Sequence, residues 1–248
     1  MLNIHTNFVN DLQAVSLAQL DCVSLQNRID SKYLLNNELF NKLLPFIHEN
    51  YKVLSIDNHR IFTYENNYFD TEDLQFYKDH HNGYLNRIKV RSRRYLETGT
   101  AYFEIKKKEK VSRTNKYRVR VADLIETPNI YQLDQIRSMS RKTLVNIHKV
   151  LHNRFNRITF VNHAATERMT LDFNILFSND SNEVLMEDIF VLEIKQSKSG
   201  SHSSIDEVIR GLHIQEQGFS KYIYGVMALF PDVKKNNFKP LLRNIKNL

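Results

Sequence analysis

Charged and apolar side chains alternate in five short segments of this sequence, and most of the charged ones are basic. Because successive side chains of a β-strand point to opposite faces, each segment predicts a strand with one charged and one apolar face. A half-buried strand whose charges merely face water has the same pattern, so one segment alone indicates little. Together the five favour a surface that binds a polyanion. They span residues 87–93, 104–106, 116–120, 168–172 and 193–195.

Composition narrows the class of protein and of ligand. The chain has 248 residues and is 42% hydrophobic, so it can form one domain over residues 1–248, with two smaller domains as the alternative. Lys and Arg total 35 against 28 Asp and Glu, and the net charge of +7 favours nucleic acid, acidic lipid or a polyphosphorylated small molecule. Cys22 is the only cysteine, which excludes an internal disulfide and a thiolate zinc site and fits a reducing compartment.

Neither a secretion signal nor a membrane span is predicted. Residues 1–10 lack the regions of a signal peptide, and the longest apolar run, 222–230, is far shorter than the roughly 20 residues of a spanning helix. We therefore expect a cytoplasmic protein. The phosphate loop Gly-x-x-x-x-Gly-Lys does not occur, so any bound phosphates must be held by side chains.

Periodicity predicts an α+β fold. We expect a helical lead-in over 1–26, helices at 37–49 and 130–151, the latter being the longest, and two short helices before a solvated basic tail at 232–248. A helical turn begins at the acidic cluster 70–73, residues 80–83 form an exposed turn, and 197–204 form a mobile Ser-rich loop. Strands are expected at 28–35, 52–56, 61–69, 85–96, 100–110, 115–121, 155–161, 167–177 and 189–196.

About eight antiparallel strands with charged inner faces suggest a closed β-barrel with a basic lumen and helices packed outside. Such a barrel has room for side chains and one slim ligand. At an effective dielectric constant of about 20, two like charges 6 Å apart repel by roughly 3 kcal/mol. A lumen lined with many bases therefore requires counter-charge, and ultimately a bound anion.

An ordered set of motifs accompanies these strands, each weak alone but all sharing one strand periodicity. The set resembles the catalytic tunnel domain of the VTC polyphosphate polymerases, within the triphosphate tunnel metalloenzymes, and we expect a stand-alone form of bacterial type. The resemblance implies an eight-stranded antiparallel tunnel that binds ATP with Mg²⁺ or Mn²⁺ and transfers its γ-phosphoryl group to a growing polyphosphate chain. The motifs are Arg28-x-Asp-x-Lys32-Tyr33, Tyr68-Phe-Asp-Thr71, Arg91-Ser-Arg-Arg-Tyr95, Phe103-Glu-Ile-Lys106, Asn156-Arg157, Arg168-x-Thr-x-Asp172, Leu192-Glu-Ile-Lys195 and Phe219-Ser-Lys-Tyr222.

The resemblance also implies roles for individual residues. Glu193 matches the metal-binding glutamate of the family. Lys116 and Arg118 lie where one further phosphate-binding base is expected, and spacing does not decide between them. Lys89, with Arg87, Lys108 and Arg120, shares the lumen periodicity and is expected to guide the phosphate chain. The bases that match the family's phosphate-binding positions are Lys32, Arg91, Arg93, Lys106, Arg157, Arg168, Lys195 and Lys221.

Phosphoryl transfer fits these residue types. Catalysis of this reaction consists mainly of positioning and charge neutralisation, which guanidinium groups and a divalent ion supply. Hydrolytic relatives are expected to carry Glu-x-Glu-x-Lys on the first strand, whereas this chain reads Arg28-x-Asp30-x-Lys32. Metal binding must then depend on Glu193 with help from Glu104, Asp30 or Asp172. The substitution favours polymerisation over hydrolysis.

Each assignment has a simpler structural alternative. The bases could be solvated strand faces, and Glu193 could be only an ion-pair partner of Lys195 or Arg168. His80 and His81 are expected in an exposed turn rather than at a metal. Asp70 is expected to cap a helix, and Tyr68, Tyr95 and Tyr222 to pack in the core or at the lumen rim.

Two other functions compete with the polymerase. One is a triphosphatase acting on inorganic triphosphate or a nucleotide; the other is a non-catalytic module that binds polyphosphate. Nucleic acid is disfavoured because it would require exposed aromatic residues beside the bases, and none are seen among the bases of the charged faces. Any membrane association, at the inner face, would require a separate membrane protein.

Overall fold

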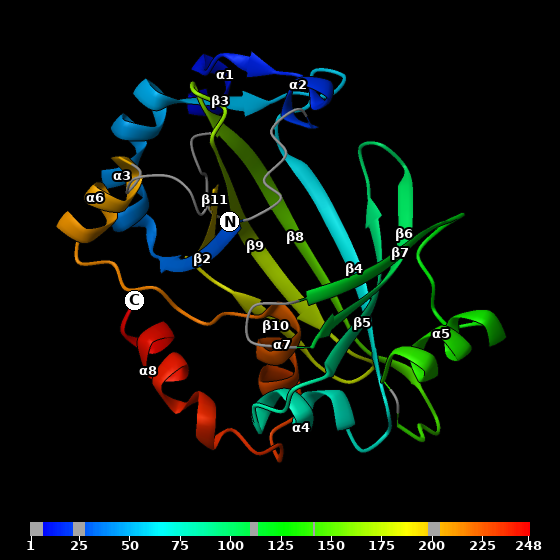
Figure 1. Cartoon of the computed structure of the whole chain (residues 1–248). Coiled ribbons are helices and arrows are strands. Elements are labelled where there is room, and N and C mark those ends of the chain that lie inside the picture. Colours follow the sequence, from blue (N-terminus) through cyan, green and yellow to red (C-terminus); the bar gives the residue numbers. More distant parts are fainter. Residues whose placement is uncertain (1–6, 22–27, 110–113, 141, 198–203) are drawn as a thin grey trace.

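A large, mostly antiparallel sheet curls on itself, and helices cover its outside (Figure 1). The computed structural model describes residues 7–21, 28–109, 114–140, 142–197 and 204–248. Cys22, residues 1–6 and 23–27 of the lead-in, and residues 198–203 of the predicted Ser-rich loop lie outside these ranges. Within them, no helix is long and apolar enough to span a membrane.

Eight strands form the main path of the sheet, as the sequence predicts. Their order is β2-β11-β9-β8-β4-β5-β6-β7, and three short strands extend it: β1 (Ala14–Val15) pairs with β3 (Tyr51–Leu54), β3 with β8, and β10 (Glu183–Met186) with β9. The bounds of the main strands are Arg28–Leu35 for β2, Phe62–Asp70 for β4, Arg87–Tyr95 for β5, Thr100–Lys108 for β6, Thr114–Val121 for β7, His148–Asn162 for β8, Glu167–Ser178 for β9 and Phe190–Ser197 for β11.

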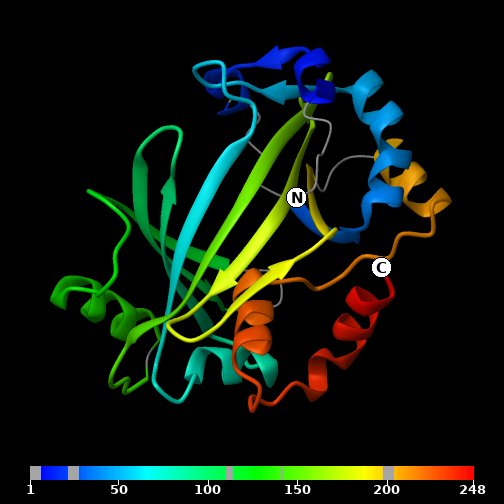
Figure 2. The same cartoon turned by 180° about the vertical axis from the view of Figure 1, so that it is seen from behind.

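The predicted closure of the barrel is corrected by the structure. β2 and β7 end the path, and their described residues are not hydrogen-bonded to each other, so the fold is a curled sheet rather than a closed barrel. Helices lie along one side and at both ends of this sheet (Figures 1 and 2). They are α1 (Asn7–Asp11), α2 (Leu17–Asp21), α3 (Asn37–Asn50), α4 (Gln75–His81), α5 (Ile130–Ser140), α6 (Ser204–Gly211), α7 (Lys221–Leu229), the 3₁₀ helix η1 (Asn236–Phe238) and α8 (Lys239–Asn247).

Apolar side chains on the outer faces of the strands hold the helices in place. Beneath α3 and α6, Leu171 of β9 and Ile194 of β11 belong to one core cluster with Leu43 and Ile209. A second cluster joins Phe103 of β6 to α5. Since the outer faces are apolar and the helices cover them, the opposite faces remain for polar groups, which confirms the predicted inside-out arrangement.

The two ends of the curled sheet carry different elements. α1, α2 and the turn between β5 and β6 lie at one end, and α4 and α7 lie at the other (Figures 1 and 2). Because β5 starts soon after α4, its first residue, Arg87, lies toward the α4 end and its last, Tyr95, toward the opposite end.

The predicted helix over 130–151 is wrong beyond Ser140. α5 ends there, Asn146 has a left-handed φ of 52°, and residues from His148 onward join β8 and pair with β4. Leu144 and Leu151 lie at helical spacing but are buried in different core clusters. Strand pairing has overridden a local pattern, as happens for short apolar segments. The longest helix is instead α3, with 14 residues.

Two features expected to be exposed pack in part against the core, although Lys234, Lys239, Arg243 and Lys246 of the basic tail are exposed as predicted. The basic tail forms η1 and α8, and Leu241 of α8 is buried in the core cluster that contains α7. His80 and His81 belong to the last turn of α4 rather than to an exposed turn. The buried His81 ring lies 3.0 Å from the Asn82 side chain and accepts a bond from the backbone N–H of Asn237.

Candidate active site

The strand register brings the predicted bases to the interior face, whose enclosed space we call the lumen. Directly opposed residues on neighbouring antiparallel strands point to the same side of a sheet. Arg91 opposes Glu104, which opposes Arg118, while Glu193 opposes Lys32 at the other end of the path. The predicted bases that share this face are Lys32, Lys89, Arg91, Arg93, Lys106, Lys116, Arg118, Arg157, Arg168 and Lys195.

Because the sheet is curled, charged groups on strands that are far apart in the strand order interact electrostatically. Although Lys106 of β6 is exposed to the lumen, the surrounding protein desolvates it and lowers its pKa, and Lys32 of β2 lowers it further. Lys89 of β5 has a pKa well below its ordinary value, first through burial and then through Lys106 and Arg91. These groups line one common space.

Lys221 reaches the lumen from a helix rather than from a strand. It is the first residue of α7, whose N-cap Ser220 accepts a bond from the Ile223 N–H and another, of 2.8 Å, from Lys89. Gly225 lets α7 approach β9 closely, since a Cβ there would lie 2.7 Å from a ring carbon of Phe177. The helix therefore holds Lys221 against the strands.

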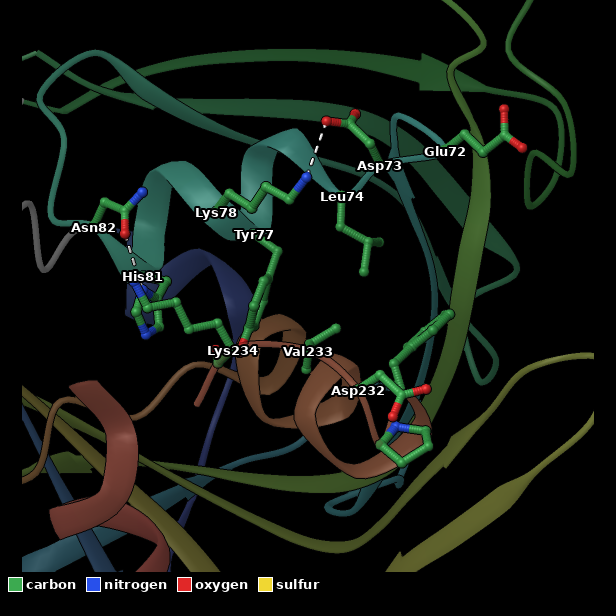
Figure 3. A pocket seen from close by; sticks show the side chains of 12 residues that line it. Glu72, Asp73, Leu74, Tyr77, Lys78, His81, Asn82, Asp232, Val233 and Lys234 are labelled. Atoms are coloured by element: carbon green, nitrogen blue, oxygen red, sulfur yellow. Dashed lines mark hydrogen bonds and ion pairs between the residues drawn. The ribbon is translucent and has the colours of Figure 1, made fainter. Parts of the chain in front are cut away.

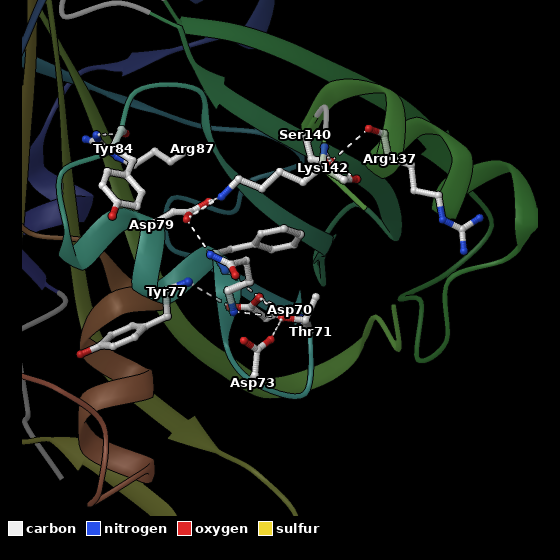
Figure 4. A network of polar contacts seen from close by, with 12 residues as sticks. Asp70, Thr71, Asp73, Tyr77, Asp79, Tyr84, Arg87, Arg137, Ser140 and Lys142 are labelled. Atoms are coloured by element: carbon white, nitrogen blue, oxygen red, sulfur yellow. Dashed lines mark hydrogen bonds and ion pairs between the residues drawn. The ribbon is translucent and has the colours of Figure 1, made fainter. Parts of the chain in front are cut away.

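Asp70 fixes the position of α7 from the outside. Its buried carboxylate accepts bonds from the backbone N–H groups of Phe76 (2.8 Å) and Tyr77 (3.0 Å), so it caps α4 as predicted. It also accepts the hydroxyl of Tyr222, the neighbour of Lys221. Figure 4 shows Asp70 beside the start of α4, together with Asp79 of α4, which binds Lys142 at 2.6 and 2.7 Å.

Glu104 is the counter-ion of three lumen bases. Its carboxylate lies 2.6 Å from Arg91 Nη2, 2.7 Å from Lys116 Nζ and 3.3 Å from Arg118 Nε. Burial alone would raise the pKa of Glu104, but Arg91 and Arg93 outweigh burial and hold the pKa well below its usual range. The structure therefore brings both Lys116 and Arg118 to the site.

Asp172 plays the same part on the other side of the lumen. Arg157 donates to it in a bidentate fork, with Nε–Oδ1 at 2.5 Å and Nη2–Oδ2 at 2.7 Å, and Lys221 also binds it. The Phe155 ring supports both cations, at 5.4 Å from Arg157 Cζ and 4.3 Å from Lys221 Nζ. The carboxylates of Glu104 and Asp172 are thus already occupied by lumen bases. This arrangement does not favour the supporting role in metal binding that the sequence suggested for them.

Glu193 is more open to another ligand than Glu104 and Asp172 are. It pairs with Lys195 at 3.0 Å and Lys32 at 3.4 Å, yet its side chain is 19% exposed, against 4% for Glu104 and 3% for Asp172. Despite burial, Lys195 and Lys32 hold its pKa well below the ordinary value, so it is ionised at neutral pH. Asp30, the other candidate helper, opposes Lys195 on β2.

The side chains of the lumen can bind a hard divalent ion only if the phosphates of a bound substrate also coordinate it. Within the described residues no group of three His, Cys, Asp or Glu side chains is placed to hold a metal ion. Mg²⁺ commonly binds through one or two carboxylates, water and substrate phosphates, and a single anionic Glu193 matches that mode. Glu193 would thus hold a metal together with a bound triphosphate.

Other lumen bases have no carboxylate partner in the described part of the chain. Arg93 is buried, donates from Nε to Asn66 Oδ1 at 2.6 Å and forms no ion pair there. Lys89 and Lys106 likewise form none in the described ranges. Burial, followed by Arg91, lowers the pKa of Arg93. Desolvated positive charges close to one another are unfavourable, and a bound anion in the lumen would offset this cost.

Several lumen residues are absent from the sequence prediction. Asn66 and Tyr64 of β4 and Phe155 of β8 contact Arg93 or Arg157. The alternation Phe62, Tyr64, Asn66 along β4 would have revealed them, because it follows the same period of two. Aromatic residues therefore do lie beside the bases, but Phe155 is buried and Tyr64 partly buried, so they are not the exposed aromatic residues that the sequence prediction excluded.

A separate cavity of about 550 Å³ lies outside the lumen, between α4 and residues 230–234 (Figure 3). Leu74, Tyr77 and Val233 line its apolar part, and Asp73 pairs with Lys78 at 3.1 Å on its side. None of the predicted site residues lines it. The candidate site is therefore the lumen.

Lys221 gives the site a pH dependence. Burial lowers its pKa to about 8, with Asp172 opposing the shift. Between that value and the unfolded pKa of about 10.4, the folded protein binds fewer protons than the unfolded chain, so the free energy of unfolding rises with pH. Over the same range the lumen loses positive charge. We expect affinity for tripolyphosphate to fall, and melting temperature of the free protein to rise, from about pH 7 to pH 9.

Calorimetric titration at each pH tests this expectation. Lys221→Arg is the matched variant, because its charge persists at every pH while titration of the ligand is unchanged. Its affinity should fall less steeply with pH than that of the unmodified protein. Parallel pH profiles would show that Lys221 does not titrate in this range.

Comparisons with known proteins identify the family and the fold. The family model described as VTC domain matches residues 27–230. The crystal structure of a candidate adenylate cyclase from Bacillus halodurans is similar at a TM-score of 0.52 and 16% identity, covering 82% of this chain and 97% of that one. A candidate adenylyl cyclase from Hippeastrum, described as having a dominant triphosphatase activity, gives a TM-score of 0.46 at 12% identity, covering 82% and 97%. A comparison with curated protein sequences finds no significant match.

Proposed function

Because the chain belongs to the VTC domain family, we propose that it is a polyphosphate polymerase, which transfers the γ-phosphoryl group of ATP to the end of an inorganic polyphosphate chain. The observation that carries the proposal is the set of lumen cations without a carboxylate partner in the described ranges: Arg93, Lys89 and Lys106. They favour a ligand with several adjacent negative charges. A polyphosphate offers one charge or more per phosphate along its chain, which suits these cations.

The proposed chemistry depends on positioning. Arg93 of β5 and Arg157 of β8 both lie near Tyr64, with Cζ atoms 5.0 and 4.9 Å from the ring centroid, and neutralise the transferred group from two strands. Lys195 and Lys221 add charge beside Glu193 and Asp172. A divalent ion held by Glu193 would neutralise further charge on the nucleotide phosphates. The attacking polyphosphate oxygen is already an anion, so no general base is needed.

The remaining expectations follow from the same proposal. The metal is Mg²⁺ or Mn²⁺, and the ligands are ATP and polyphosphate in the cytoplasm; a separate membrane protein would mediate any membrane association. A triphosphatase is the alternative function. It would use an activated water in place of the polyphosphate end.

Product analysis tests the proposal. The purified protein is incubated with ATP and either Mg²⁺ or Mn²⁺, with and without a short polyphosphate primer, and the products are separated on a gel. We expect a ladder of polyphosphate that appears sooner with primer, together with ADP. Absence of polymer under every primer and metal condition, with steady release of orthophosphate, would favour the triphosphatase.

A further inference from the structure

Aromatic and guanidinium groups gather at the end of the lumen beside the β5–β6 turn. Tyr95, the last residue of β5, contacts Tyr64 at a centroid distance of 4.7 Å and Tyr102 at 6.0 Å. Arg118 lies across Tyr102 with its Cζ 3.6 Å from the ring centroid, and donates to the Tyr95 hydroxyl at 3.1 Å. We call Tyr95, Tyr102 and Arg118 the stacking platform.

The platform adjoins the phosphate-binding bases, and its Arg118 is exposed while Tyr95 and Tyr102 are partly buried. The Arg118 side chain is 38% exposed, so a planar ligand can reach its guanidinium group. Tyr102 opposes Arg93 directly on the neighbouring strand. Along β5, Tyr95 follows Arg91 by four residues, which places it about 13 Å farther along the strand. A molecule with phosphates at Arg91 and Arg93 would therefore extend onto the platform.

The opposite end of the lumen has a different chemistry. Arg87 opposes Lys108 there, and Lys89 contacts Ser220 at the start of α7. This end offers charge for a phosphate chain. The platform instead offers flat apolar and cationic surfaces, on which nucleobases stack readily. The α4 end therefore suits the phosphates of a nucleoside triphosphate, and the platform suits its base.

We propose that the stacking platform binds the base of the nucleoside triphosphate, so that the nucleoside lies at the β5–β6 end while its phosphates lie among Arg91, Arg93 and Arg157. The inference rests on the proposed function in one respect: that the lumen accepts a nucleoside triphosphate. Stacking tolerates any base, because every base has a π-face. The platform therefore contributes affinity for the nucleoside without reading its identity.

Paired ligands separate this role from general phosphate binding. Without metal ions, where no transfer is expected, calorimetry measures the dissociation constants of ATP and of inorganic tripolyphosphate, which has no base. In Tyr102→Ala we expect ATP to bind at least about fivefold more weakly. Tripolyphosphate should change by less than about twofold. Tyr102→Phe keeps the ring and should bind both ligands as the unmodified protein does.

Tyr84→Ala is the matched control. Tyr84 is an aromatic residue with 55% exposure that follows α4, at the opposite end of the sheet, and its loss should leave both affinities unchanged. Equal weakening of ATP and tripolyphosphate in Tyr102→Ala, or no weakening of ATP, would overturn the inference. So would an unmodified protein that binds tripolyphosphate but not ATP. Melting curves of each variant verify folding.

The outcomes also distinguish this inference from the proposed function. A protein that binds ATP through Tyr102 but makes no polyphosphate would refute the polymerase and leave the platform in place. A polymerase whose Tyr102→Ala variant binds ATP normally would refute the platform alone.

Discussion

Replacing Arg93 with alanine is expected to reduce turnover by about 10³-fold or more, the range seen when a guanidinium group that stabilises a transferred phosphoryl group is lost. Arg93 is buried, is held by Asn66 at 2.6 Å and lies over Tyr64, with no carboxylate partner in the described ranges. Its charge is thus available to a ligand. Arg93→Lys should also be costly, because a point charge does not replace a planar fork. Initial rates with saturating ATP measure the effect.

Arg94 provides the matched control. It follows Arg93 in the chain but points to the outer face, where it pairs with Glu65 at 2.7 Å and Asp123 at 2.8 Å. Arg94→Ala should change turnover by no more than about threefold, since neither of its ion-pair partners is a lumen residue. Similar losses in the two variants would mean that the assignment of faces, or the role of Arg93, is wrong.

Glu193→Gln is expected to reduce metal-dependent turnover by about 10²-fold or more. The amide preserves the shape of the side chain but removes the anionic oxygens that a hard divalent ion requires. It also leaves Lys195 and Lys32 without their carboxylate partner, so metal-free tripolyphosphate should bind at least as tightly as before. Opposite changes in turnover and in metal-free affinity distinguish a metal ligand from a merely structural residue.

Glu65→Gln serves as the control for removing a carboxylate. Glu65 lies on β4 and pairs with Arg94 rather than with a lumen base. Neither turnover nor metal dependence should change appreciably. If Glu193→Gln behaved like Glu65→Gln, then Glu193 would be only the ion-pair partner of Lys195 and Lys32.

Much of the fold and the membership of the site could be predicted because both depend on strand periodicity. In residues 87–93 every second residue, starting with Arg87, is basic, and the register carries that alternation from strand to strand. The predicted strand 28–35 agrees with β2, and the predicted cap Asp70 holds α4. Alternation along a strand determines the face of the sheet to which each side chain points, and the prediction of the lumen bases needed only that information.

What could not be predicted depends on contacts between distant segments. Local spacing around Leu144 resembles a helix, but pairing with β4 makes residues from His148 onward a strand. The sequence also shows Glu104 and Asp172 as acids near bases without showing which bases they neutralise. Only the curled sheet brings Arg91, Lys116 and Arg118 to one carboxylate and leaves Arg93 without an acid among the described residues.

The fate of the γ-phosphoryl group tests the central claim most directly. ATP labelled in its γ-phosphate is incubated with the protein, a divalent ion and a short polyphosphate primer, and the label is followed into polymer and into orthophosphate. A polymerase should place most of the label in chains longer than the primer, with one ADP formed per phosphate added. Label released as orthophosphate in step with ADP, with none in polymer, would contradict the account.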